Sequence, residues 1–218
     1  MGLQPIEVFK EDRRSRVWLV HSASLGRVAI KRWEYSPWRQ RAARLVGLHP
    51  GQREWRSNRR LAVLGIAVVP VLAGGVVRGW LGDRYWLATP LWGRSVQRWL
   101  TRGRGPTWAA RRRGILGLAR MADRLLHRGL VFRDLKTSNV IADAGGQVWL
   151  IDVGSVRRSV SRGPRLRMLA MLDKTAAGDG ATRADRVRFL RALVGAWPEL
   201  GDVRAAAKAI LAARERLP

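Results

Sequence analysis

The sequence of 218 residues contains no cysteine, which excludes disulfide frameworks, cysteine-based zinc sites and thiol catalysis. This absence fits a reducing compartment. The N-terminus lacks a basic segment followed by an apolar one, so we expect no secretory signal peptide. The longest uncharged run, residues 61–77, is short for a membrane span and is interrupted by Pro70, Gly74 and Gly75. It predicts instead the end of a helix, a turn and a buried strand.

Acidic residues are scarce: 16 Asp and Glu stand against 42 Lys and Arg, for a formal net charge of +26. Such a surface attracts polyanions, among them nucleic acid, anionic lipid and phosphorylated glycan. Nearly all of the basic residues are arginine. This skew, with the abundance of alanine, glycine and tryptophan, also fits codon bias in the source genome, and the sequence alone leaves both explanations open.

Secondary-structure patterns divide the chain into a strand-rich part and a helical part. Trp55, Leu61, Leu64 and Ile66 follow one helical face, and Gly65 marks a helix end. The first part predicts strands at 6–10, 16–20, 27–33, 71–79 and 84–92, and a helix at 52–66. The second predicts helices at 95–100, 106–129, 165–174, 183–195 and 201–216, and a hairpin at 140–151.

The stretch HRGLVFRDLKTSNV, residues 127–140, has two interpretations. In the first, it is a surface loop between a helix and a strand, where aspartate and asparagine suit turns. Alternatively, it is a catalytic loop in which Asp134 handles a substrate proton and Asn139 holds a metal ion. The stretch itself does not distinguish these two, so the decision depends on the rest of the chain.

Five residues in a fixed order favour the catalytic interpretation. Lys31 ends a strand reading VAIK, and Glu54 lies in the next predicted helix. Asp134 and Asn139 share an R-D-x-x-x-x-N loop, and Asp152 follows the apolar strand VWLI. Phosphoryl transfer from ATP uses such a set: a lysine on the α/β-phosphates, a carboxylate that fixes it, a base, and oxygen ligands for Mg²⁺. Each residue alone has an ordinary structural explanation, whereas their order and context together predict a kinase.

The motifs VAIK, FRDLKTSN and IDVG resemble the protein-kinase-like superfamily. The arginine-rich segment ending in QREWRSNRRLAVLGIAVVP, the stretch HRGLVFRDLKTSNV, and the ending with RLRMLAMLDK and DRVRFLRAL resemble the bacterial lipopolysaccharide kinases that phosphorylate core heptose or Kdo. The resemblance implies an α+β, two-lobed fold with an N-lobe at 1–91 and a helical C-lobe at 92–218. It also implies that Lys136 touches the transferred phosphate and that residues 89–92, with Thr89 and Leu91, form the adenine-facing hinge.

Some positions depart from the kinase pattern. Phe132 stands where histidine is usual, and Val153 replaces the phenylalanine of D-F-G. KEDRRSR, residues 10–16, occupies the place of the glycine-rich loop, so side chains replace backbone amides as the expected phosphate contacts. No A-P-E motif follows Asp152, which argues against a peptide-substrate groove. Arg157 and Arg158 are either acceptor contacts or a solvated basic turn.

We therefore expect a kinase that uses ATP and Mg²⁺ and phosphorylates a sugar hydroxyl of a lipopolysaccharide-core-like glycolipid. The alternatives are a small atypical protein kinase of the type associated with tRNA modification, and a basic pseudokinase that binds nucleic acid. Residues 32–60 interleave Trp33, Trp38 and Trp55 with eight arginines. This pattern favours peripheral, electrostatic binding to the cytoplasmic face of the inner membrane, unless the tryptophans are core residues.

Overall fold

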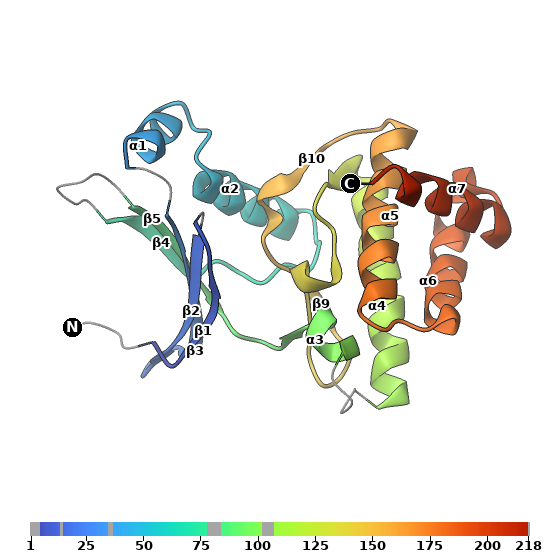
Figure 1. Ribbon diagram of the computed structural model, residues 1–218, viewed down its shortest axis with the longest axis horizontal. Helices are drawn as coiled ribbons and strands as arrows, with labels where there is room; N and C mark the ends of the chain where they lie inside the picture. The colour runs from blue at the N-terminus through green and yellow to red at the C-terminus, as the bar shows by residue number, and fades with distance from the viewer. Residues whose placement is uncertain (1–4, 14, 35–36, 78–83, 102–106, 218) are drawn as a thin grey trace. The chain divides into compact units, whose positions relative to one another are not determined.

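The computed structural model describes residues 5–13, 15–34, 37–77, 84–101 and 107–217. They form two compact units. One consists of the chain up to Leu64 together with Val68–Leu91; the other consists of Gly65–Ala67 together with the chain from Trp92 onward. The first unit carries an antiparallel sheet and the second is mostly helical (Figure 1). The expected α+β, kinase-like fold class is confirmed.

The first unit is built on five antiparallel strands in the order β1-β2-β3-β5-β4. The side chains of Leu19, Val20, Val28 and Leu87 are buried in its core because alternate residues of each strand face inward. The strands are β1 (Glu7–Glu11), β2 (Ser15–Ser22), β3 (Gly26–Trp33), β4 (Ala73–Val77) and β5 (Arg84–Pro90). All five expected strands are present.

The strand β4 differs from its prediction. It lies at the edge of the sheet, paired only with β5, and Ala73 and Val77 are exposed, so the expectation of a buried strand was wrong. A side chain at Gly74 would collide with Leu87 and Trp55. Gly74 therefore lets β4 approach Leu87 and Trp55 closely. Residues 78 and 79 of the expected strand lie outside the described residues.

Two helices, α1 (Pro37–Leu45) and α2 (Pro50–Val63), join β3 to β4. The sequence predicted only α2. Glu54, Asn58 and Leu61 recur at helical spacing on its buried face, and the side chain of His49 caps its first turn by accepting a hydrogen bond from Gly51 N at 3.0 Å. Gly65 follows with φ +69°, the left-handed conformation that ends many helices.

The second unit combines four long helices with several short strands. Figure 1 shows these helices gathered in one bundle, in which α6 packs on α4, and α7 on α5 and α6. The helices are α3 (Val96–Thr101), α4 (Trp108–His127), α5 (Arg162–Gly178), α6 (Arg183–Ala196) and α7 (Val203–Glu215). The strands are β6 (Arg94–Ser95), β7 (Leu130–Phe132), β8 (Val140–Ala142), β9 (Val148–Leu150) and β10 (Val156–Arg158). Within the described residues, no helix combines the length and hydrophobicity needed to cross a bilayer.

Candidate active site

Lys31 and Glu54 form an ion pair inside the first unit. Lys31 Nζ on β3 donates to Glu54 Oε2 on α2 at 2.8 Å, and the two side chains are 20% and 12% exposed. Lys31 Nζ also lies 4.9 Å from the centre of the buried Trp33 ring. The α2 helix that carries Glu54 is fixed in turn by Asn58, whose Nδ2 donates to Val69 O at 2.7 Å. The ammonium group is therefore held in one place, as a phosphate contact requires.

The expected hinge residues lie at the end of β5. Thr89 is paired with Ala29 of β3, and both Thr89 and Leu91 are half-buried. The amide of Leu91 donates to Arg27 O at 3.0 Å. Because this amide is already used, a backbone contact from Leu91 to adenine has only its carbonyl oxygen to offer.

The turn between β1 and β2 stands where a glycine-rich loop is usual. Ser15 N donates to Asp12 Oδ1 at 2.7 Å, which closes a tight turn. Lys10 pairs with Asp12 at 2.9 Å and Arg16 with Glu11 at 3.1 Å. These cations are shared with neighbouring carboxylates, so a phosphate at this turn would have to compete with them.

In the second unit, β7 leads directly into the expected catalytic loop. Gly129, with φ +62°, ends α4 and turns the chain into this strand. Phe132 is fully buried, its amide donates to Met168 Sδ at 3.1 Å, and it is paired with Val156 of β10. The phenylalanine that replaces the usual histidine therefore anchors the loop through apolar packing.

Asp134 lies at the centre of a small polar cluster. Its Oδ2 accepts a hydrogen bond from Asn139 Nδ2 at 3.1 Å and lies 3.1 Å from Lys136 Nζ. Asn139 Nδ2 also donates to Asp134 O at 2.9 Å. The two contacts orient the Asp134 carboxylate, and they commit the Asn139 amide nitrogen as a donor, which leaves its oxygen as the atom suited to a metal ion.

The catalytic loop is also anchored by contacts with the end of α5, through residues that the sequence did not single out. Thr137 is buried, its hydroxyl donates to Asp179 Oδ2, and its amide donates to Thr175 Oγ1 at 3.3 Å. Thr175 lies in the last turn of α5 and Asp179 is its C-cap. These contacts fix the short turn that separates Lys136 from Asn139.

Asp152 follows β9, which is paired with β8 in the expected hairpin. Ile151 N donates to Asn139 O at 3.0 Å, so the chain enters Asp152 directly beside Asn139. Asp152 is exposed and is the only non-glycine residue with positive φ (54°) in the described part of the chain. Aspartate tolerates this conformation better than most residues, and such strain concentrates at functional sites.

The donor set fits a magnesium ion that is shared with phosphate. Asn139 and Asp152 supply an amide and a carboxylate oxygen, and Mg²⁺ commonly binds one or two protein oxygens together with substrate phosphates and water. No cluster of three or more acidic or histidine side chains occurs among the residues that the structure describes. A site made by protein side chains alone is therefore not seen there.

Arg157 and Arg158 lie on β10, paired with Val131 and Leu130 of β7, and both side chains are exposed. This pairing holds the two arginines one strand away from the segment that leads to Asp134. Both are available to an anionic group, as one of the two interpretations from the sequence requires.

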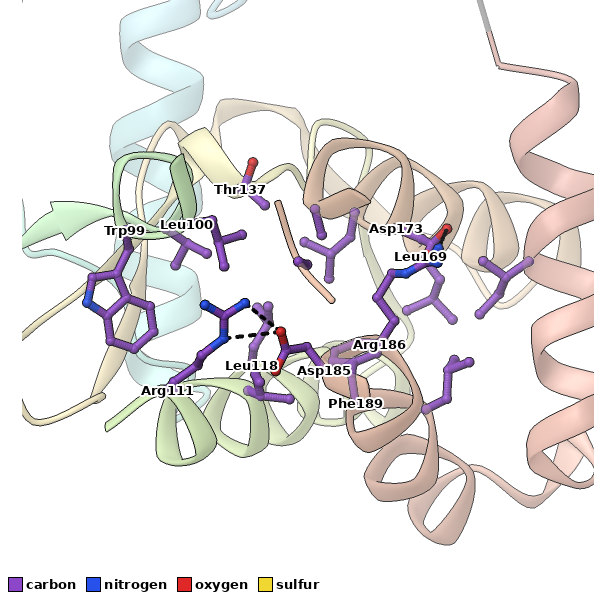
Figure 2. A pocket seen from close by; sticks show the side chains of 18 residues that line it. Trp99, Leu100, Arg111, Leu118, Thr137, Leu169, Asp173, Asp185, Arg186 and Phe189 are labelled. Carbon is purple, nitrogen blue, oxygen red and sulfur yellow. Dashed lines mark hydrogen bonds and ion pairs between the residues drawn. The ribbon is translucent and has the colours of Figure 1, made fainter. Parts of the chain in front are cut away.

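A separate cavity of about 70 Å³ lies among the helices of the second unit (Figure 2). Its wall is mainly apolar and includes the side chains of Trp99, Leu100, Leu118 and Phe189. The ion pair between Arg111 of α4 and Asp185 of α6 also lies at its wall. Thr137 also lines it, so the cavity backs onto the catalytic loop. Sequence patterns gave no sign of it, because its walls come from segments far apart in the chain.

Comparison with known proteins identifies the family. No curated protein matches the chain. A family model described as the lipopolysaccharide kinase (Kdo/WaaP) family matches residues 39–193, which is well over half of the sequence. The match begins after Lys31 and includes the whole segment from Glu54 to Asp152. The chain therefore belongs to the lipopolysaccharide kinase (Kdo/WaaP) family, and it is a phosphotransferase with an alcohol group as acceptor.

Proposed function

We propose that this kinase transfers the γ-phosphate of ATP, in a reaction that depends on Mg²⁺, to a sugar hydroxyl of a lipopolysaccharide-core-like glycolipid. One observation carries the proposal. Asn139 and Lys136 orient the Asp134 carboxylate, and the carbonyl of Asn139 accepts a hydrogen bond from the amide of Ile151, which precedes Asp152. A base and two metal-ligand oxygens thus occur within one small network, as phosphoryl transfer needs.

In the first unit, Lys31 binds phosphate oxygens of ATP, and Glu54 keeps its ammonium group in place. A paired, half-buried lysine loses less rotamer freedom on binding than an exposed one. The backbone at Thr89 and the carbonyl of Leu91 contact the adenine. The β1–β2 turn contributes side chains rather than a run of backbone amides.

In the second unit, Asp134 orients the acceptor hydroxyl and accepts its proton as the new bond to phosphorus forms. Lys136 lies beside this carboxylate and neutralises charge on the transferred phosphoryl group. Asn139 and Asp152 are the metal ligands; when bound, Mg²⁺ offsets the negative charge of the phosphates. Arg157 and Arg158 bind anionic groups of the acceptor.

A lipid-linked acceptor is met at a membrane surface. The net charge of +26 favours an anionic leaflet, and we propose peripheral association with the cytoplasmic face of the inner membrane. Binding to nucleic acid is the competing outcome of the same charge.

The test is a transfer assay with ATP labelled at the γ-phosphate, Mg²⁺ and defined acceptors. We expect label in a purified lipopolysaccharide-core glycolipid, loss of this label when Mg²⁺ is chelated, and no label in a glycolipid whose core hydroxyls are blocked. Label only in protein would indicate a protein kinase. An absence of ATP turnover with every acceptor would indicate a scaffold.

A further inference from the structure

The helix α1 carries an apolar stripe that faces away from its own unit. Trp38, Ala42 and Leu45 are spaced by four and three residues, so they share one face of the helix, and all three are exposed. Trp38 is 68% exposed and Leu45 is 77% exposed. The usual arrangement in a globular protein is the reverse, with the apolar stripe of a surface helix turned to the core.

The buried polar residue Gln40 ties α1 to the sheet. Gln40 is 3% exposed, its Nε2 donates to Trp33 O at 3.0 Å, and its Oε1 accepts from Tyr85 N at 3.1 Å. Gln40 therefore ties the inner face of α1 to β3 and β5. Figure 1 shows α1 standing off the sheet next to β5.

The turn after α1 extends the apolar surface. Val46 and Leu48 are 68% and 64% exposed, so four large apolar side chains between positions 38 and 48 face solvent. Gly47 between them has φ +70°, and its carbonyl accepts a hydrogen bond from Arg56 Nη1 of α2 at 3.2 Å. The turn is thus built to present these side chains rather than to bury them.

The surroundings of this surface are positively charged. No acidic residue occurs in the sequence between Glu34 and Glu54. Arg39 and Arg41 are exposed on α1, and Arg53 and Arg56 are exposed on α2. The guanidinium of Arg39 lies 5.3 Å from the centre of the Trp38 ring. Tryptophan and leucine beside arginine suit the boundary between acyl chains and anionic headgroups.

We propose that Trp38, Leu45, Val46 and Leu48 form a membrane-docking surface that inserts into the headgroup region of an anionic bilayer. The inference rests on the proposed function, since a lipid-linked acceptor brings the enzyme to such a surface. It also corrects the expectation for residues 32–60. Trp33 is 3% exposed and belongs to the core, Trp55 packs near Gly74, and Trp38 is the one of the three that is largely exposed.

The absence of cysteine makes a direct test straightforward. Leu48→Cys provides a single thiol for a fluorophore that shifts to the blue in an apolar environment, and Leu211→Cys on α7 provides the same label in the second unit. With vesicles of phosphatidylglycerol and phosphatidylcholine, we expect a blue shift at position 48 and none at 211. A label at position 48 that stays in water would overturn the proposal.

Vesicle cosedimentation supplies the energetics. Trp38→Ala with Leu45→Ser should weaken binding by about tenfold or more, because the inserted apolar area is lost. Arg39→Gln with Arg41→Gln should weaken it about 25-fold, since each arginine near an anionic leaflet contributes roughly fivefold. The matched controls change exposed residues of the second unit: Trp108→Ala with Leu211→Ser, and Arg183→Gln with Arg204→Gln. Each should lower vesicle affinity less than the matching change on α1.

The other outcomes are also decisive. If the Trp38 and Leu45 changes turn a dimer into a monomer in sedimentation velocity, the surface covers a second copy and the membrane proposal fails. Equal binding to anionic and neutral vesicles overturns the charge argument. Transfer to a detergent-solubilised acceptor separates the two proposals. Activity there with no insertion of the label refutes the docking proposal alone, and insertion without transfer to the glycolipid refutes the proposed function alone.

Discussion

Lys31 Nζ lies 2.8 Å from Glu54 Oε2, across 23 positions of sequence and between two different elements of the first unit. Both side chains are largely shielded from solvent, so each charge is stabilised by the opposite charge of its partner. A lysine held in this way presents its charge to phosphate in one place.

A double-mutant cycle tests whether the pair acts as a unit in binding ATP. Lys31→Ala and Glu54→Gln should each weaken ATP binding, and the double variant should be little worse than Lys31→Ala. The expected coupling is roughly 0.5–3 kcal/mol, the range for neighbouring groups. Isothermal calorimetry on the four proteins gives this value. The Arg32–Glu34 pair, at 2.6 Å, serves as the control and should show no coupling in ATP binding. Full additivity for Lys31 and Glu54 would contradict the assigned role.

Asp134→Asn should leave the fold and ATP binding intact, because an asparagine oxygen can still accept the hydrogen bond from Asn139. The rate of transfer should fall by roughly 10²- to 10⁴-fold, the usual contribution of a positioned acid or base. Single-turnover transfer measures this rate. Glu215→Gln, an exposed change at the end of α7, is the control. Activity within a few-fold of the parent in Asp134→Asn would remove this residue from the reaction.

The sequence predicted the long elements better than the short ones. The helices α2 and α4 repeat an apolar face over several turns, and glycine marks their ends, so local pattern is sufficient. The strands β6, β7 and β10 have only two or three residues each, which is too short to show a period. The sequence does not predict the helix α1, because its apolar stripe is narrow and three of its nine residues are arginine.

The candidate site follows the same distinction. Short local motifs contain Asp134, Asn139 and Asp152, so the sequence alone was sufficient to identify them as candidates. The contact of Thr137 with Asp179 spans 42 positions and depends on how α5 packs. The outward turn of α1 likewise depends on Gln40, 45 positions from its partner Tyr85. Contacts of this kind are set by tertiary packing, and no periodicity in the sequence reports them.

Asp152→Asn tests the metal site without disturbing the backbone. Asparagine tolerates the left-handed conformation at φ 54°, whereas alanine there would be strained. Removing the negative oxygen should lower the affinity for Mg·ATP by roughly 10- to 100-fold or more, since even an outer-sphere partner of a metal ligand contributes that much. Affinity for ATP without Mg²⁺ should change little.

Titrations of ATP with and without Mg²⁺ measure both affinities. Asp143→Asn, at the other end of the β8–β9 hairpin, is the control, because an asparagine oxygen can still accept the hydrogen bond from Gln147 N. If Asp152→Asn gains as much from Mg²⁺ as the parent does, the metal is held elsewhere.

The ion pair between Arg111 and Asp185 predicts how stability depends on pH. Arg111 Nε on α4 donates to Asp185 Oδ2 on α6 at 3.1 Å, across the cavity wall (Figure 2). Burial acts to raise the pKa of the Asp185 carboxyl, but hydrogen bonds from Arg111 and Thr182 outweigh it and leave this pKa below its usual value. A depressed pKa means that folding is stabilised by the charged form.

The stabilisation is therefore fully present above about pH 4, the pKa of an unfolded aspartate, and is lost as the pH falls through the lower pKa of the folded state. Asp185→Asn should cost about 3 kcal/mol at pH 7, the lower end for a broken buried pair, because the Arg111 side chain is 24% exposed. The difference from the parent should shrink steadily below pH 4, where the parent carboxylate also loses its charge.

Urea unfolding at several pH values between 7 and 2.5 measures this difference. Asp202→Asn is the matched control, since asparagine caps α7 as well as aspartate does and Asp202 is exposed. Its stability should follow that of the parent at every pH. A gap between the parent and Asp185→Asn that is as large at pH 2.5 as at pH 7 would show that the charge of Asp185 does not stabilise the packing of α4 against α6.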